Sequence, residues 1–293
     1  MERIKIGNAA GWCKSQEQVE ALASSAADFI VVGSVTLEPR VGNAGKTFNG
    51  ESLNFSGMPN PGIEKIKEIA PEMIRAAHGG GKSIILSLGG GSVEEFTALC
   101  TEALTCGFDG MELNLSCPNV IEGTDRKTIV SYDKKLVEEI IHSCAELVAR
   151  HSSNAFLTAK FSPFSNPEEL VATARVVSAC DIAGVVTQNT VPNCLLFNDD
   201  GTVQIETADG TGWAGLSGPA VKAMALGQVN QWRRALNTEG SNIPVWGVGG
   251  VATGRDVLDM KRAGAAVVQV GTAYFTHGAK IFGDIAAEYI DLS

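Results

Sequence analysis

The chain has 293 residues, of which 44% are hydrophobic and 19% are charged, and its formal net charge is −10. Such a composition predicts a fully folded protein with a large core, because disordered chains carry few apolar residues and much more charge. The acidic balance argues against a nucleic-acid partner, since that binding depends on a basic surface. Seven cysteines occur without CxxC pairs or His/Cys ligand spacing, which argues against a metal site and a disulfide framework.

No apolar run approaches the ~18 residues that a membrane span requires. The first six residues, Met-Glu-Arg-Ile-Lys-Ile, contain no apolar core followed by a cleavage site. We therefore expect a cytoplasmic protein with no membrane partner.

Short runs rich in Val and Ile alternate with helical stretches along the whole chain. The predicted strands are residues 4–6, 29–32, 83–88, 110–115, 156–161, 184–187, 245–248 and 266–270. The predicted helices are residues 15–26, 62–78, 92–106, 133–151, 167–179, 218–237, 253–263 and 275–289. The strand runs lack polar alternation, which is typical of parallel strands covered on both faces. Eight such units without a linker predict one domain over residues 1–293, an α/β fold of the (β/α)8 TIM-barrel type.

A doubly wound open sheet shares this local pattern and is the alternative. Three long irregular stretches, residues 38–61, 118–132 and 189–217, follow the second, fourth and sixth strands. In a barrel they would lie at the same face, where the active site is built. This placement favours the barrel.

Glycines follow the last two predicted strands. Residues 247–250 read Gly-Val-Gly-Gly and residues 269–272 read Gln-Val-Gly-Thr. Glycines at strand ends let backbone N–H groups approach an anion, and in barrels the loops after strands seven and eight are the usual phosphate site. A single Gly-Gly turn is weak evidence, but two at these strand ends predict phosphate binding.

The segment 112–120, Glu-Leu-Asn-Leu-Ser-Cys-Pro-Asn-Val, runs off the fourth strand into a loop. It would place a thiol and two amides at the catalytic face. Most cysteines are ordinary buried residues, but Cys117 stands beside proline in a polar loop, where a small hydrophobe has little packing purpose. A thiol has a pKa of ~8.5; once its neighbours lower that value it ionises, and the thiolate can accept a proton.

The segment at Cys117 resembles the motif of the class 1 dihydroorotate dehydrogenases, which dihydropyrimidine dehydrogenases share in part. The similarity extends over essentially the whole chain. It includes residues 8–11, 36–43, 54–62, 160–163, 189–190 and the two glycine turns, all in family order. The resemblance implies an FMN-dependent oxidation of (S)-dihydroorotate to orotate in de novo pyrimidine (UMP) biosynthesis.

The resemblance also implies the site residues. Cys117 matches the catalytic base, which would remove the C5 proton while C6 delivers hydride to flavin N5. The substrate-binding residues would be Lys14, Asn54, Asn114, Ser116, Asn119, Asn189 and Thr190. The cofactor-binding residues would be Ala10, Gly11, Lys14, Ser34, Asn114, Lys160, Gly218, Gly249, Gly250, Gly271 and Thr272. Residues 118–132 would form a lid over the site.

Two lysines, Lys160 and Lys14, lie in segments of the predicted site. Lys160 ends an apolar strand, and a buried lysine needs an anionic partner; the family's lysine here lies against the flavin pyrimidine. The alternative is a lysine that extends its ammonium out to solvent. Class 1 enzymes carry another lysine on the second strand, where this chain has Gly33. Residues 9–14 are instead similar to class 2 enzymes, so Lys14 is predicted to fill that space, although class 2 uses serine as its base.

The combination of a class 1-like cysteine with a class 2-like lysine leaves other functions open. A dihydrouracil-type dehydrogenase would share the asparagines, and a non-catalytic flavin-binding subunit would share the barrel. A tRNA dihydrouridine synthase is also an FMN barrel with a loop cysteine, but the net charge argues against it. The electron acceptor is open and includes a possible partner subunit, since no CxxC cluster suggests an internal iron–sulfur relay. By resemblance we expect a homodimer. The four histidines are interpreted as helix or surface residues, and Trp12 and Trp213 as packing residues in loops that could border the flavin.

Overall fold

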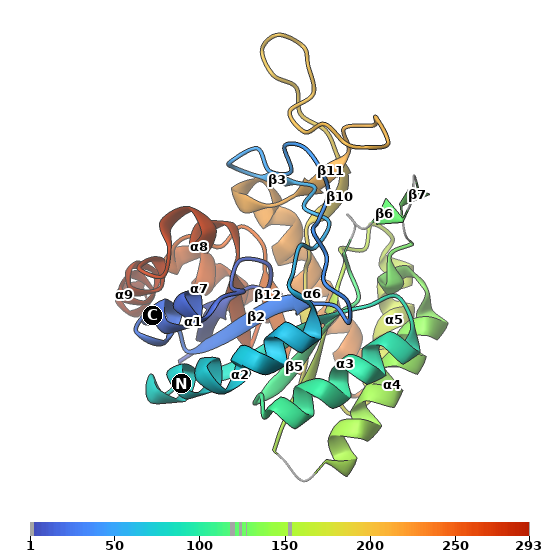
Figure 1. Ribbon diagram of the computed structural model, residues 1–293, viewed down its shortest axis with the longest axis vertical. Coiled ribbons are helices and arrows are strands. Elements are labelled where there is room, and N and C mark those ends of the chain that lie inside the picture. Colours follow the sequence, from blue (N-terminus) through green and yellow to red (C-terminus); the bar gives the residue numbers. More distant parts are fainter. Residues whose placement is uncertain (1–2, 118–120, 123–124, 127, 152–153, 293) are drawn as a thin grey trace.

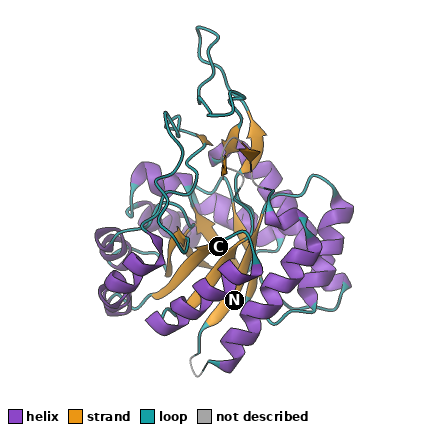
Figure 2. Ribbon diagram, turned by 45° about the vertical axis from the view of Figure 1, so that its right-hand side comes forward, coloured by secondary structure: helices purple, strands orange, loops and turns teal. Residues whose placement is uncertain are grey.

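In the described residues, 3–117, 121–122, 125–126, 128–151 and 154–292 of this computed structural model, eight parallel strands close into a barrel (Figures 1 and 2). In order round the barrel they are β1 (Lys5–Asn8), β13 (Val267–Val270), β12 (Val245–Val248), β9 (Gly184–Thr187), β8 (Phe156–Phe161), β5 (Gly110–Asn114), β4 (Ser83–Gly89) and β2 (Phe29–Val35). The carboxyl ends of these strands therefore all lie at one face of the barrel. The prediction of a barrel is confirmed, and the alternative of a doubly wound open sheet is wrong.

Helices cover the outside of the barrel (Figure 2). They are α1 (Gln16–Ala23), α2 (Gly62–Gly79), α3 (Val93–Cys106), α4 (Lys134–Arg150), α5 (Pro167–Ser178), α6 (Lys222–Thr238), α7 (Gly254–Ala263), α8 (Thr272–His277) and α9 (Ile281–Leu292). Ser15 and Thr253 begin α1 and α7 with capping boxes, which satisfy the first backbone N–H groups of each helix. None of the described helices is long and apolar enough to cross a bilayer.

Two predicted helices differ from the structure. The prediction of a single helix over residues 275–289 is wrong. The helix is interrupted at Gly278, whose φ of 68° lies in the left-handed region. The helix expected from residue 218 begins as a 3₁₀ turn, η2 (Gly218–Val221), before α6. Pro219 lies at the start of that turn.

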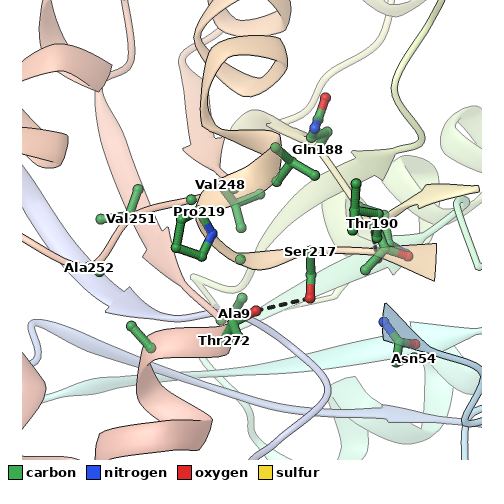
Figure 3. Close-up of a pocket in the computed structure, with 18 of the residues that line it drawn as sticks. Ala9, Asn54, Gln188, Thr190, Ser217, Pro219, Val248, Val251, Ala252 and Thr272 are labelled. Carbon is green, nitrogen blue, oxygen red and sulfur yellow. Dashed lines mark hydrogen bonds between the residues drawn. The ribbon is translucent and has the colours of Figure 1, made fainter. Parts of the chain in front are cut away.

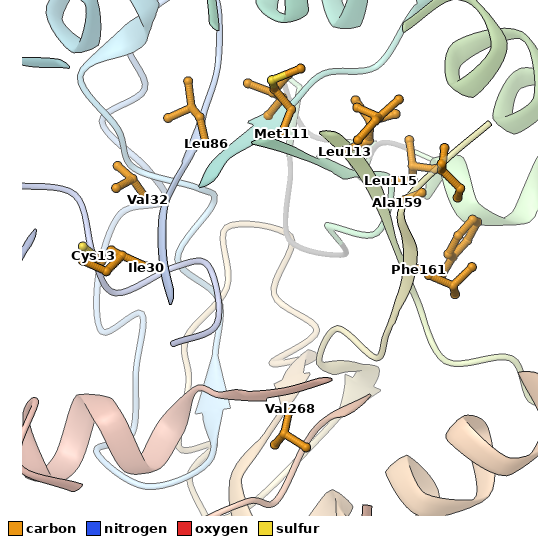
Figure 4. Close-up of a cluster of buried hydrophobic side chains, with 14 of the residues drawn as sticks. Cys13, Ile30, Val32, Leu86, Met111, Leu113, Leu115, Ala159, Phe161 and Val268 are labelled. Atoms are coloured by element: carbon orange, nitrogen blue, oxygen red, sulfur yellow. The ribbon is translucent and has the colours of Figure 1, made fainter. Parts of the chain in front are cut away.

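The main hydrophobic core lies between the strands and the surrounding helices. Ile30, Val32, Leu86, Met111 and Leu113 belong to this cluster and have no exposed surface (Figure 4). Consecutive strand residues point to opposite faces, so their neighbours fill the barrel interior. Burial of both faces explains why the strands read as continuous apolar runs.

The barrel interior has an apolar end and a polar end. Near the strand starts, the ring of Trp246 packs against those of Phe29 and Phe156, with centroids 5.3 and 6.3 Å apart. Glycines make room for these rings: a Cβ atom at Gly184 would lie 2.4 Å from the Trp246 Nε1 atom. Toward the carboxyl ends, polar side chains take over, among them the fully buried Gln269. The interior therefore becomes polar where the barrel opens.

Two of the stretches expected to be irregular pair with each other above the barrel. Their strands, β3 (Leu53–Asn54), β10 (Val191–Cys194) and β11 (Ala214–Leu216), form a sheet in the order β10-β11-β3. Figure 1 shows this sheet over one end of the barrel, with the segment between β10 and β11 projecting farthest. The third stretch contains a small hairpin of β6 (Ile121–Glu122) and β7 (Asp125–Arg126), followed by the 3₁₀ turn η1 (Val130–Tyr132). The prediction that 38–61 and 189–217 share a face is confirmed, but the expectation that they lack regular structure is wrong.

Candidate active site

The glycine turns after β12 and β13 border one cavity of about 220 Å³ at the open end of the barrel (Figure 3). Its wall includes Gly218, Gly249, Gly250, Gly271 and Thr272. The Thr272 hydroxyl donates a hydrogen bond to the Ser217 hydroxyl at 3.1 Å, which joins α8 to the segment that leads into η2. The cofactor-site residues predicted from the two turns thus share one cavity.

Side chains behind Gly250 hold its turn in place. Gly250 has a φ of 73°, and a Cβ atom there would lie 2.6 Å from the Lys222 Cβ atom, so only glycine fits. The Lys222 ammonium lies 2.6 Å from an Asp256 carboxylate oxygen. The other Asp256 oxygen accepts hydrogen bonds from the backbone N–H groups of Ala252 and Thr253, each at 2.9 Å. The turn is therefore braced by a local ion pair and by the cap of α7.

Gln188 supplies an observation that fits a polar ring system in this cavity. It lines the wall near Val248, and both polar atoms of its side-chain amide are buried without a hydrogen-bond partner among the described residues. A buried amide without a partner is costly, so such groups are normally satisfied by protein, water or ligand. A heterocycle edged with N–H and C=O groups has the chemistry to satisfy it. The residues present therefore fit a flavin.

An adjoining cavity continues toward the predicted substrate site. The two share Ala10, Trp12, Asn54, Lys160, Asn189 and Thr190. The adjoining cavity is also lined by Gly11, Lys14, Ser34, Asn114 and Cys117. The glycine turns, both lysines, the thiol and the amides thus border one continuous space. Asn119 lies outside the described residues, as does part of the expected lid, 118–132.

Hydrogen bonds fix the amide groups of this space. The Asn114 Nδ2 group donates to the Ser34 hydroxyl at 2.8 Å. The Asn114 Oδ1 atom accepts from the Ser116 hydroxyl at 2.9 Å, and the Asn189 Nδ2 group donates to the same hydroxyl at 3.0 Å. Ser116 is fully buried and does not border either cavity, so it holds the two amides from behind. Asn54 reaches the site from β3, where β11 pairs with it.

Lys14 lies within electrostatic reach of Cys117. Its ammonium donates to the carbonyl oxygen of Pro59 at 2.6 Å. Burial lowers the pKa of Lys14, and the charge of Cys117 opposes that shift. Attraction acts on both partners, so the ammonium also favours the thiolate form of Cys117. The neighbouring thiol of Cys13 is different, because burial raises its pKa to about 12 and keeps it protonated.

Gly33 explains why the second-strand lysine is absent. Its φ is 110°, and a Cβ atom there would lie 2.7 Å from the carbonyl oxygen of Ser87. No side chain fits this backbone. Lys14 borders the same cavity as Ser34, the residue that follows Gly33. The prediction that Lys14 fills the space of the second-strand lysine of class 1 enzymes therefore agrees with the geometry.

Lys160 is buried and paired. It is 4% exposed, and its Nζ atom lies 3.7 Å from the Glu112 Oε1 atom. The alternative of a lysine reaching out to solvent is wrong. Its anionic partner, Glu112, is 1% exposed and belongs to the barrel interior. Glu112 is the charged residue of β5, and this acid on a buried strand is the sequence signal for the partner of Lys160.

The comparisons with known proteins agree with this geometry. The family model described as dihydroorotate dehydrogenase matches residues 4–292. The chain belongs to the dihydroorotate dehydrogenase family. This family comprises flavin-dependent oxidoreductases, so the predicted enzyme class is confirmed at that level.

Curated relatives of the family match nearly end to end. A putative dihydroorotate dehydrogenase A (fumarate) of Streptococcus equi is 30% identical over 290 residues, which cover 97% of this chain and 88% of the relative. A dihydroorotate dehydrogenase (fumarate) of Lachancea kluyveri is 30% identical with the same coverage. A crystal structure of DHODH from Eimeria tenella in complex with ferulenol superposes with a TM-score of 0.79 at 19% identity, covering 98% of this chain and 80% of that one. This last likeness concerns the fold.

Several residues around the family site were not singled out from the sequence. They are Ala9, Gln188, Ser217 and Leu216, with His277 at the end of α8. No local pattern marks these residues, because they meet only when distant loops close over the barrel. Trp12, which we expected to be a packing residue in a loop at the site, lines both cavities and packs against Phe48 and Phe275, with centroids 5.5 and 4.1 Å away.

Proposed function

We propose that the protein is an FMN-dependent dihydroorotate dehydrogenase that oxidises (S)-dihydroorotate to orotate in de novo pyrimidine biosynthesis. One observation carries the proposal. A thiol, Cys117, and an ammonium, Lys14, share a cavity with the amides of Asn54, Asn114 and Asn189, and this cavity continues into the glycine-lined one. The site therefore places a proton acceptor beside hydrogen-bonding groups for a pyrimidine, and next to a space for a flavin.

The glycine-lined end is the proposed phosphate site. Gly249, Gly250, Gly271 and Thr272 would hold the FMN phosphate through backbone N–H groups, with Gly218 beside them. Ala10, Gly11, Ser34, Asn114 and Lys160 would lie along the ring system. Bound there, FMN would supply a two-electron acceptor for the hydride of the substrate.

The asparagines and Thr190 are the proposed substrate-binding groups. Each asparagine presents a carbonyl acceptor and an N–H donor, which suits a ring edged with alternating C=O and N–H groups. The Asn114 and Asn189 amides are held in one orientation by Ser116, so they would not need to reorganise when substrate binds. By resemblance to the family, Asn119 completes this set. Lys14 would offer its charge to the substrate carboxylate.

Cys117 is the proposed base. Its thiolate would take the C5 proton while the hydride leaves C6, and the C5=C6 double bond forms. Lys14 favours the thiolate, since an adjacent ammonium lowers the pKa of a thiol. Lys14 therefore serves both substrate binding and activation of the base.

Side-by-side assays test the substrate. We expect dihydroorotate, with an artificial acceptor, to give orotate that is detected by its ultraviolet absorbance, and dihydrouracil to react far more slowly. A preference for dihydrouracil would reassign the protein as a dihydropyrimidine dehydrogenase. Fumarate is the first natural acceptor to try, because the similar curated proteins carry it in their names. We further propose a cytoplasmic homodimer, which light scattering of the purified protein would test.

A further inference from the structure

A buried carboxylate in the barrel interior has no part in the function proposed above. The Glu112 Oε2 atom accepts a hydrogen bond from the Gln269 side-chain amide at 2.7 Å. The Oε1 atom accepts from the Ser87 hydroxyl at 3.4 Å and lies 3.7 Å from the Lys160 ammonium. Among the described residues, Glu112 and Lys160 are the buried charged residues on the barrel strands. They form a desolvated ion pair.

The two charges stand in a definite order relative to the cavity. Lys160 borders both cavities, whereas Glu112 borders neither. Glu112 therefore lies behind Lys160 as seen from the cavity. Any negative charge that develops in the cavity is attracted by the ammonium and repelled by the carboxylate, and both effects are strong because the interior has a low dielectric constant.

The carboxylate also fixes the direction of a hydrogen-bond chain that ends in the cavity. An ionised carboxylate only accepts, so Ser87 donates to Glu112. Ser87 then accepts from Ser34, whose hydroxyl is 2.9 Å away, and Ser34 accepts from the Asn114 Nδ2 group. This leaves the Asn114 carbonyl oxygen turned toward Ser116. One buried charge thus orients both the lysine and an amide of the site.

We propose that Glu112 is a positioning residue that offsets the charge of Lys160 and thereby sets the reduction potential of the flavin bound beside it. This inference rests on the proposed FMN site. Two-electron reduction of a flavin held there would add negative charge next to Lys160. An uncompensated ammonium would stabilise the reduced cofactor further and hold back its reoxidation, so Glu112 lowers the potential and keeps the cofactor able to pass its electrons on.

The midpoint potential of the bound flavin tests the inference, measured by equilibrium reduction against a reference dye. Glu112→Gln keeps the shape of the side chain and removes its charge. We expect a shift of at least tenfold in favour of reduced flavin, which is about 30 mV upward for a two-electron couple. Lys160→Met should shift the potential downward. If Glu112 only held Lys160 in place, Glu112→Gln would also lower the potential; a downward shift or no shift would overturn the proposal.

If a single variant loses its flavin, the urea midpoint of unfolding still tests whether Glu112 and Lys160 form an ion pair. We expect Glu112→Gln and Lys160→Met each to lower the urea midpoint, and the double variant to recover most of the loss, because removing one partner leaves a buried uncompensated charge. Thr158→Val, which alters the same interior without changing charge, is the matched control. Strictly additive losses would overturn the pairing. Failure of the wild-type protein to bind FMN would instead refute the proposed function, and the unfolding cycle would still report on Glu112.

Discussion

The backbone of Gly33 passes so close to the Ser87 carbonyl oxygen that a Cβ atom at Gly33 would lie 2.7 Å from it. Position 33 can therefore carry no lysine, and Lys14 borders the same cavity as the adjacent Ser34 from the loop after β1. Lys14 shares that cavity with Cys117.

Gly33→Ala should destabilise the protein by roughly 2–5 kcal/mol, because a left-handed φ costs a side chain about 1–2 kcal/mol and overpacking about 1–3 kcal/mol. The measurement is the free energy of unfolding in urea. Gly79→Ala is the control, since a Cβ atom at Gly79 meets nothing within 4 Å. Equal stability of the two variants would show that Gly33 is not under steric constraint.

Lys14→Met should shift the pH dependence of flavin reduction by substrate to higher pH. The sign follows from the charge: the Lys14 ammonium stabilises the Cys117 thiolate, so its loss raises the pKa of the thiol. Stopped-flow reduction rates across pH measure the shift. Lys14→Arg keeps the charge and should retain most of the wild-type profile. An unchanged profile in Lys14→Met would separate Lys14 from the base.

Cys117→Ala should bind flavin normally but slow its reduction by ~10²–10⁴, the usual contribution of a general base. The rate is followed by loss of visible flavin absorbance under anaerobic conditions. Cys106→Ala, a half-buried thiol on α3, serves as the control and should react at the wild-type rate. Undiminished reduction in Cys117→Ala would remove Cys117 from the mechanism.

Gly250→Ala should abolish flavin retention, because the new Cβ atom would lie 2.6 Å from the Lys222 Cβ atom and displace the turn. The measurement is the ratio of flavin to protein after gel filtration. Gly210→Ala is matched in backbone conformation, with a φ of 70° and nothing within 4 Å. Retention of flavin by Gly250→Ala would place the phosphate elsewhere.

The sequence was sufficient for the barrel and for much of the site because both depend on local patterns. Apolar runs located the strands, and in a barrel of parallel strands their carboxyl ends share one face. Cys117 and Gly250 follow strands directly, so their place in the site could be predicted from the chain alone. The resemblance to the family, rather than this rule, pointed to Lys14, Asn54 and Asn189.

Other features depend on distant pairings. Asn54 reaches the site because β3 pairs with β11, and its Nδ2 atom lies 3.4 Å from the carbonyl oxygen of Gly215, a residue 161 positions away. Gln269 on β13 meets Glu112 on β5 across the barrel interior, and these strands do not pair with each other, so only closure of the barrel brings the two side chains together. The interruption between α8 and α9 at Gly278 depends on local conformation instead. The glycine is visible in the sequence, but only its left-handed conformation ends the helix.

The most direct test of the account is an anaerobic titration of the purified protein with dihydroorotate, followed by its visible flavin absorbance. We expect prompt and stoichiometric bleaching, with orotate as the product. A protein that retains FMN but stays yellow with excess dihydroorotate would contradict the proposed substrate.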